Sequence, residues 1–220
     1  MMDQTDAADR KQARAVVDHY TKLAPAYDTR WEIYSRNSLG KLAEHLRLEG
    51  GEHMLDLACG TGRLATLLRH THPALRVTGV DISTEMLRVA RQRLPEDERT
   101  AWHLGTLETV QLRPGTFDLV TCNNAFHLML DQPGVLARMV RLARPDGAIA
   151  IVDWCREYPQ IAALQLLAPL LDRQHRNILT RPQLKALLEG AGLELECSAR
   201  FMATRFWGMM CMVARKPAAA

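Results

Sequence analysis

The stretch EHMLDLACGTGRLATLL, which runs from Glu52 to Leu68, decides the fold of this 220-residue chain. An apolar run carries Asp56 near its end, Gly60 and Gly62 follow one residue apart, and a helical spacing of leucines begins behind them. This order predicts a buried strand, a tight turn and a helix. Because glycines let the backbone approach a ligand closely, the turn marks a binding site at the end of a strand.

Composition places the chain among ordinary globular proteins. Its hydrophobic content of 47% and charged content of 24% suit one domain with a full core. The formal charge of +3 is small and the arginines are spread along the chain, so we expect no nucleic-acid partner. The start MMDQTDAADRKQ is unlike a signal or transit peptide, and no apolar run approaches the ~20 residues that a membrane span needs.

The five cysteines lie in apolar surroundings and form no CxxC pair. This pattern indicates reduced thiols in a cytoplasmic protein, with neither disulfides nor a metal site.

Two kinds of segment alternate along most of the chain. Residues 7–48 have helical spacing, which Pro25 is expected to break into two or three helices. Short runs of strand character follow at 53–58, 76–81, 100–105, 117–122 and 147–154, with amphipathic stretches between them. Strands that alternate with helices predict a parallel, doubly wound α/β sheet that is covered on both faces.

The last third of the chain departs from this alternation. An apolar helical segment at 158–172 is interrupted by Pro169, and a helix from Arg181 stops at the glycines of LLEGAG. Two strands then follow, at 193–201 and 206–216, close enough in sequence to form an antiparallel pair.

The glycine turn fits two cofactors. Gly60, Gly62 and Ala65 form G-x-G-x-x-A, and Asp81 follows at the end of the second strand, as in the dinucleotide-binding fingerprint. An oxidoreductase that uses NAD is therefore one hypothesis. Asp56 argues against it, because a carboxylate four residues before Gly60 would repel a pyrophosphate at a cost of kilocalories. S-adenosylmethionine has no phosphate and carries two cations, so the two acids and the glycines favour it.

Five segments resemble the class I S-adenosylmethionine-dependent methyltransferases. LDLACGTGRLA and VTGVDIS are similar to the first two motifs of that family, while FDLVTCNNAFHLM and LARPDGAIAIVDW resemble its fourth and fifth strand segments. HYTKLAPAYDTRW resembles the cap of the subgroup that acts in ubiquinone and menaquinone biosynthesis. The resemblance implies a seven-stranded Rossmann-like sheet, with an N-terminal helical cap over residues 1–50 and an S-adenosylmethionine-binding methyltransferase domain over 51–220.

The resemblance also implies a set of cofactor-binding residues. They are Tyr20, Tyr27, Asp56, Ala58, Gly60, Gly62, Asp81, Ile82, Met86, Thr106, Leu107 and Asn123. Asp81 would hold the ribose, Ile82 would pack on the adenine, and Asn123 would lie beside the methionine portion. The family often has an acid after the third strand, where this chain has Thr106, so the Thr106 hydroxyl or the Leu107 amide would meet the adenine instead.

A second set of residues is expected around the transferred methyl group. They are Trp31, Phe126, His127, Trp154 and Cys155, together with the cap tyrosines Tyr20 and Tyr27. His127 is the candidate general base because its unperturbed pKa is near neutral, although a pocket wall is the more common role for a histidine at this place. His175 and Arg176 fit a solvated helix end better than a pocket.

The predicted function is methyl transfer from S-adenosylmethionine to a small, weakly polar molecule, a quinol-like ring or a small thiol. The alternatives are the NAD-dependent oxidoreductase and a cofactor-binding protein without catalysis. Methyl transfer needs no obligatory catalytic residue, because the sulfonium already activates the methyl group and the protein mainly aligns the reactants.

Overall fold

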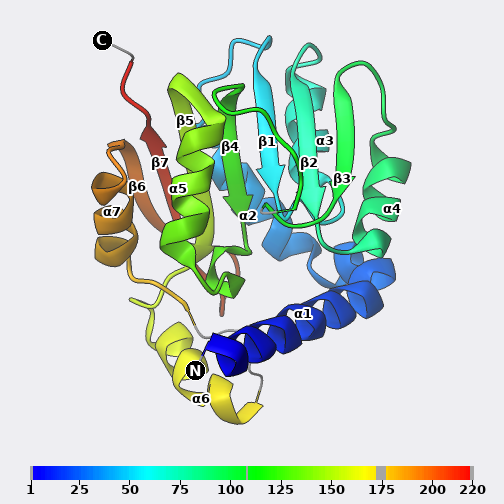
Figure 1. The fold of residues 1–220 in the computed structure, drawn as a ribbon. Helices are drawn as coiled ribbons and strands as arrows, with labels where there is room; N and C mark the ends of the chain where they lie inside the picture. Colours follow the sequence, from blue (N-terminus) through cyan, green and yellow to red (C-terminus); the bar gives the residue numbers. More distant parts are fainter. Residues whose placement is uncertain (1, 108, 172–176, 219–220) are drawn as a thin grey trace.

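The computed structural model describes residues 2–107, 109–171 and 177–218. Its strands are β1 (His53–Leu57), β2 (Arg76–Asp81), β3 (Thr100–Leu104), β4 (Phe117–Asn123), β5 (Ala143–Trp154), β6 (Glu194–Met202) and β7 (Gly208–Arg215). Together they form a seven-stranded sheet in the order β3-β2-β1-β4-β5-β7-β6 (Figure 1). β1 to β5 are parallel, and β7 runs antiparallel to both of its neighbours. The predicted α/β sheet and its C-terminal antiparallel pair are confirmed.

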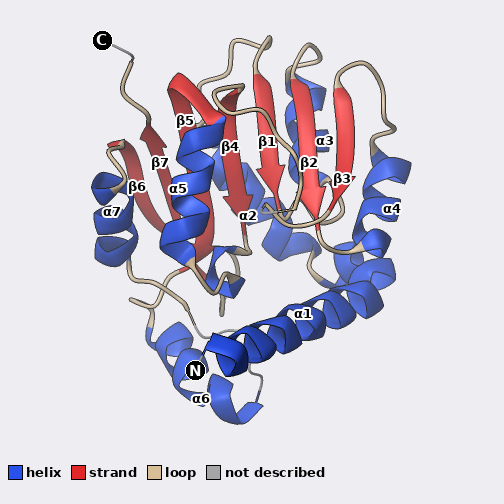
Figure 2. Cartoon of the chain, viewed as in Figure 1, coloured by secondary structure: helices blue, strands red, loops and turns tan. Residues whose placement is uncertain are grey.

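Helices cover both faces of this sheet (Figure 2). They are α1 (Met2–Arg30), α2 (Glu32–His45), α3 (Arg63–Thr71), α4 (Thr84–Arg93), α5 (Gln132–Leu142), α6 (Pro159–Leu171) and α7 (Arg181–Gly190), with a single 3-10 turn η1 (Phe126–Leu128). Buried residues of α2, α3 and α4 share one hydrophobic core cluster, while those of α5 and α7 belong to a second. The sheet is therefore doubly wound, with a separate core on each face.

Neither proline ends a helix, contrary to the sequence prediction. α1 continues through Pro25 and the chain turns only at Trp31, and α6 likewise continues through Pro169. A proline inside a helix removes one hydrogen bond and crowds the preceding turn, but tertiary contacts can outweigh that cost. In α1, polar contacts from Thr21 and Asp28 hold the helix on both sides of the proline.

Side chains cap the first turns of two helices. The Ser83 hydroxyl caps α4 by accepting a hydrogen bond from the Met86 N–H at 3.3 Å, and Thr180 forms a capping box with Gln183 at the start of α7.

β5 begins earlier than predicted because the RPDG turn lies inside it as an irregularity. Asp146 has a φ of 62° there, and the pairing with β4 shifts between Phe117 and Leu119.

The first two helices lie in different places. α1 runs across the carboxyl ends of the parallel strands (Figure 1). α2 instead packs on the sheet, and its Tyr34, Leu39 and Leu42 belong to the same core cluster as α3 and α4. The division of the chain near residue 50 stays a prediction. None of the helices in the described residues has the length and hydrophobicity of a membrane span.

Gly79 supplies a test of how tightly β2 packs. A Cβ atom at Gly79 would lie 2.3 Å from the Trp102 ring and 3.0 Å from the Cys59 Sγ. Gly79→Ala should lower the free energy of unfolding by ~1–3 kcal/mol, the usual cost of overpacking, as measured by urea denaturation. Gly40→Ala in α2 is the control, because nothing lies within 4 Å of its Cβ position and helix propensity favours alanine. Equal effects of the two substitutions would refute this packing argument.

Candidate functional site

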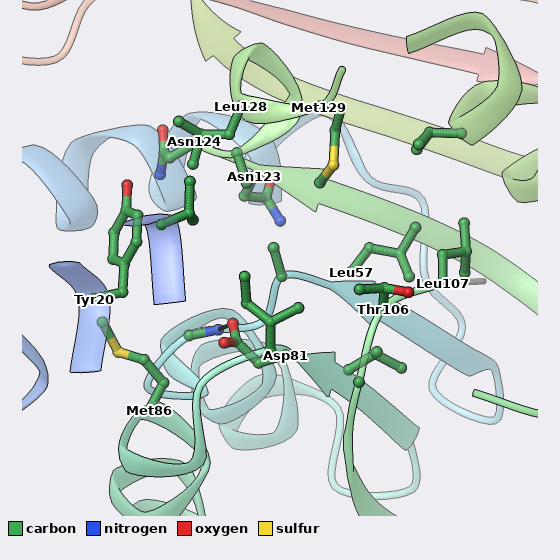
Figure 3. Close-up of a pocket in the computed structure, with 18 of the residues that line it drawn as sticks. Tyr20, Leu57, Asp81, Met86, Thr106, Leu107, Asn123, Asn124, Leu128 and Met129 are labelled. Carbon is green, nitrogen blue, oxygen red and sulfur yellow. Dashed lines mark hydrogen bonds between the residues drawn. The ribbon is translucent and has the colours of Figure 1, made fainter. Parts of the chain in front are cut away.

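A pocket of about 350 Å³ is lined by residues of α1 and by residues at the carboxyl ends of the strands. Figure 3 shows Tyr20 of α1, Asp81 of β2 and Asn123 of β4 around the same space. All predicted cofactor residues except Asp56 and Gly62 line it. They are Tyr20, Tyr27, Ala58, Gly60, Asp81, Ile82, Met86, Thr106, Leu107 and Asn123.

Asp81 is held rigidly at one side of this pocket. Its Oδ2 accepts a hydrogen bond from the Gly60 N–H at 2.8 Å, and its Oδ1 accepts one from the Ser83 N–H at 2.9 Å. Burial raises the pKa of Asp81, and the backbone N–H groups of Ser83, Gly60 and Ile82 partly oppose this shift. A carboxylate offers about four acceptor positions, so two of these bonds leave capacity for hydroxyl groups of a ligand.

Asp56 and Asn123 border a second, smaller cavity of about 50 Å³ that adjoins the pocket through Ala58 and Gly60. Asp56 Oδ1 accepts hydrogen bonds from Thr121 Oγ1 at 2.7 Å and from Asn123 Nδ2 at 3.4 Å. Burial raises the pKa of Asp56 to about 7, although these two bonds lower it. The Asn123 Oδ1 is buried without a hydrogen-bond partner among the described residues.

These two groups fit the methionine end of S-adenosylmethionine. A buried acceptor without a partner costs free energy, and an ammonium group is a donor that would supply the missing bond. The same ammonium would also favour the charged form of the neighbouring carboxylate. The hydrogen-bond acceptors of this cavity therefore suit a cation and not a phosphate.

Gly62 serves the turn and not the pocket wall. It adopts a φ of 72°, and a Cβ atom there would lie 3.0 Å from the Trp102 ring and 3.1 Å from the Ala90 Cβ. A side chain at this position would meet both strain and crowding. Gly60 also has a positive φ of 53°, and its backbone N–H reaches Asp81.

Asp28 ties α1 to the glycine turn. Its carboxylate accepts a hydrogen bond from Thr61 Oγ1 at 2.8 Å, lies 3.6 Å from the Arg63 guanidinium, and is hydrogen-bonded to the Arg93 guanidinium. Thr21 adds a contact of 3.2 Å with the Ser83 hydroxyl. These contacts place Tyr20 and Tyr27 over the pocket, with their ring centroids 6.2 Å apart. Burial and the nearby Asp28 raise the pKa of Tyr27 to about 12, so its phenol is neutral at physiological pH.

The five residues expected around the acceptor lie elsewhere. None of Trp31, Phe126, His127, Trp154 and Cys155 lines the pocket or the smaller cavity. Phe126 and Cys155 are buried in the core on the α5 face. Trp31 and Trp154 instead pack against Trp207, with ring centroids 5.7 and 4.5 Å from it. Two further candidates, His175 and Arg176, fall outside the described residues.

His127 is not placed to act as the general base in this structure. It is 2% exposed, its Nδ1 lies 2.6 Å from Asp153 Oδ1, and its ring stacks on Trp154. The reason is the phase of η1, because successive side chains of a 3-10 turn point roughly 120° apart. Phe126 and His127 point into the protein, and Leu128 points into the pocket.

The remaining pocket residues, most of them without a polar side chain, were not predicted from the sequence. They are Val16, Leu57, Val80, Gly105, Asn124, Ala125, Leu128, Met129, Leu130, Asp131 and Val135. Most of them lie at strand ends or in the segment after β4, so their position in the predicted topology was the one available signal.

Residues 55–151 match the family model described as a methyltransferase domain. A 2-phytyl-1,4-naphtoquinone methyltransferase of Thermosynechococcus vestitus is 33% identical over 154 residues, which cover 66% of this chain and 66% of the relative. The chain belongs to the class I S-adenosylmethionine-dependent methyltransferases. The family's cofactor, S-adenosylmethionine, thus agrees with the hydrogen-bond acceptors of Asp56 and Asn123.

Two further comparisons concern a second curated relative and a solved structure. A malonyl-acyl-carrier-protein O-methyltransferase of Serratia marcescens is 32% identical over 150 residues, covering 66% of this chain and 54% of the relative. A solved S-adenosylmethionine-dependent methyltransferase of Mesorhizobium loti has a TM-score of 0.70 at 20% identity, over 84% of this chain and all of that one. At that identity the structural likeness supports the fold alone. The two curated relatives carry different acceptors in their names and extend beyond the matched region.

Asp56→Asn should stabilise the ligand-free methyltransferase at pH 8 and weaken its cofactor binding. The raised pKa means that the folded protein holds a proton that the unfolded chain has lost, so wild-type stability falls as pH rises from about 4 to 7. The variant has no such carboxyl group to ionise. Its free energy of unfolding at pH 8, measured by urea denaturation, should be ~1–3 kcal/mol higher than that of wild type. Its affinity for S-adenosylhomocysteine should be lower and nearly constant from pH 6 to 8, where wild-type affinity rises.

The matched control is Asp131→Asn, which makes the same charge change at the pocket wall. Asp131 caps α5 through the Gly134 N–H, and asparagine caps helices equally well. An affinity profile against pH that is the same for wild type and Asp56→Asn would rule out this role of Asp56.

Asp28→Asn should loosen α1 over the pocket. The variant keeps an acceptor for Thr61 but loses the ion pairs with Arg63 and Arg93, which are partly exposed. Such pairs contribute ~0.2–1 kcal/mol each, so S-adenosylhomocysteine should bind roughly 2- to 10-fold more weakly by calorimetry. Hydrogen exchange in residues 17–30 should be faster, and ligand should slow it in both proteins.

Glu32→Gln, which removes the exposed Glu32–Arg36 pair, is the control. Unchanged exchange and affinity in Asp28→Asn would show that the ion pairs do not hold this helix.

Proposed function

We propose that this methyltransferase transfers the methyl group of S-adenosylmethionine to a small, weakly polar acceptor of the quinol type. The observation that carries the proposal is the composition of the part of the pocket wall formed by α1, α5 and the segment after β4. That wall consists mainly of apolar side chains, namely Val16, Ala125, Leu128, Met129, Leu130 and Val135. Of the described residues that line the pocket, none is a lysine, arginine or histidine.

This composition favours a neutral ring over an acid as acceptor. Recognition of a carboxylate or phosphate uses charge-assisted bonds, most often from arginine or lysine, whereas an apolar wall matches an uncharged ring. The name of the Thermosynechococcus relative, a 2-phytyl-1,4-naphtoquinone methyltransferase, points to the same class of acceptor. A small thiol is the second candidate, since it too needs little polar recognition.

The chain's own residues would bind and orient the reactants. Bound S-adenosylmethionine supplies an activated methyl group, so alignment and exclusion of water are the main tasks of the protein. Asp81 would hold the ribose hydroxyls, and Asp56 with Asn123 would hold the ammonium. Tyr20 and Tyr27 would close the pocket from α1, and Thr106 with Leu107 would border the adenine. This arrangement argues against NAD, because Asp56 would face its pyrophosphate.

Two further properties belong to the proposal. The five cysteines are free thiols, which supports the cytoplasm as the location. The formal charge of +3 supports a small-molecule acceptor and no nucleic-acid partner.

The test is methyl transfer to four acceptor candidates with S-adenosylmethionine in excess, followed by mass spectrometry. The candidates are 1,4-naphthoquinol kept reduced, thiophenol, trans-aconitate and a nucleoside phosphate. We expect methylation of the quinol or the thiol, and binding of S-adenosylhomocysteine but not NAD by calorimetry. Methylation of the acids alone would overturn the acceptor class, and tight NAD binding would overturn the reaction.

A further inference from the structure

Asp153 is a buried carboxylate that lies outside the pocket. It lies in β5 directly before Trp154, the last residue of the strand, and is 2% exposed. Its Oδ2 accepts a hydrogen bond from the His127 backbone N–H at 2.6 Å, and its Oδ1 lies 2.6 Å from His127 Nδ1. Because a carboxylate only accepts, the imidazole carries its proton on Nδ1 toward Asp153. One acid therefore holds both the backbone and the side chain of His127.

His127 lies in the segment that forms the apolar wall of the pocket. Ala125, Leu128, Met129 and Leu130 line the pocket, while His127 points away from it toward Asp153. Because the turn is short, holding the His127 side chain in place also fixes the direction of the neighbouring side chains that line the pocket. The position of the wall thus depends on how His127 is held.

Other side chains hold the carbonyl groups of the same segment. Gln132 Nε2 donates a hydrogen bond to the Phe126 carbonyl at 2.9 Å, and Asn177 Nδ2 donates one to the Met129 carbonyl at 2.8 Å. Between these two carbonyl groups, the His127 N–H donates a hydrogen bond to Asp153. The segment 125–130 is therefore clamped from β5, α5 and the stretch before α7.

Aromatic contacts connect this clamp to Asn124, which directly precedes the segment. The His127 ring stacks on Trp154 with centroids 4.4 Å apart, and Trp154 Nε1 donates a hydrogen bond to the Tyr34 hydroxyl at 2.8 Å. Tyr34 donates in turn to Asn124 Oδ1 at 2.8 Å, and Asn124 lines both the pocket and the smaller cavity. The wall and Asn124 share one continuous chain of contacts.

We propose that Asp153 and His127 are positioning residues that hold segment 125–130 as the acceptor wall of the pocket. The inference rests on the proposed function for the identity of the acceptor side, and it assigns no proton transfer to His127. A buried, charge-assisted bond of this kind sets the geometry of the groups it joins. The pair acts on acceptor binding, while Asp56 and Asp81 act on the cofactor.

Two amide variants of His127 separate this role from simple structural damage. The amide nitrogen of His127→Asn takes the place of Nδ1 and can still donate to Asp153, whereas that of His127→Gln takes the place of Nε2 and cannot. With 1,4-naphthoquinol as probe, His127→Gln should raise KM at least tenfold and change kcat less. His127→Asn should stay within about threefold of wild type in KM. Both should bind S-adenosylhomocysteine within twofold of wild type by calorimetry.

Hydrogen exchange tests the same inference without an acceptor. The Leu128 and Met129 N–H groups donate to the Ala125 and Phe126 carbonyls within the turn. They should exchange at least tenfold faster in His127→Gln, near the wild-type rate in His127→Asn, and β4 amides should not change in either. If wild type does not methylate the quinol, the proposed acceptor fails and the exchange data decide the positioning role.

Three outcomes would overturn the positioning role. Unchanged exchange and KM in His127→Gln would show that the bond to Asp153 holds nothing. Equal losses in both variants would show that the wall responds to the imidazole itself. A hundredfold fall in kcat with unchanged KM would identify His127 as a base instead.

Discussion

The hydrogen bond from the Gly60 N–H to Asp81 is the interaction on which the rest of the site depends. It joins the turn after β1 to the end of β2, and in doing so it leaves one buried carboxylate at the pocket wall. Asp56 places a second one at the adjoining cavity. Burial raises the pKa of both groups, since neither has a cation beside it strong enough to offset the loss of solvation. The two carboxylates therefore favour a ligand that brings hydrogen-bond donors to Asp81 and positive charge to Asp56.

The N-terminal helices take part in the site in two different ways. α1 lies across the strand ends and is held by polar contacts from Thr21 and Asp28. α2 is part of the core and reaches the pocket through the bond from Tyr34 to Asn124. The roof of the pocket is therefore held by a few polar contacts, whereas α2 is packed into the core.

The sequence predicted the polar half of the site far better than the apolar half. Residues such as Asp81 and Asn123 end strands, and strand ends of a parallel sheet meet at one edge whatever the details of packing. His127 and Phe126 were assigned to the wall by their place after β4, but the phase of a three-residue turn decides which side chain faces the pocket. Pro25 misled for a related reason, because contacts distant in sequence outweighed a local rule.

The placement of the apolar wall has a consequence for how the enzyme family diversifies. Most of that wall comes from one short stretch, 124–131, which contains neither of the two acids and none of the glycines that form the other half. On the proposed acceptor assignment, substitutions confined to residues 125–130 would change the acceptor while Asp56, Asp81 and the glycine turn stay in place. Such a division would let one scaffold serve acceptors of different chemistry through changes in a short run of codons.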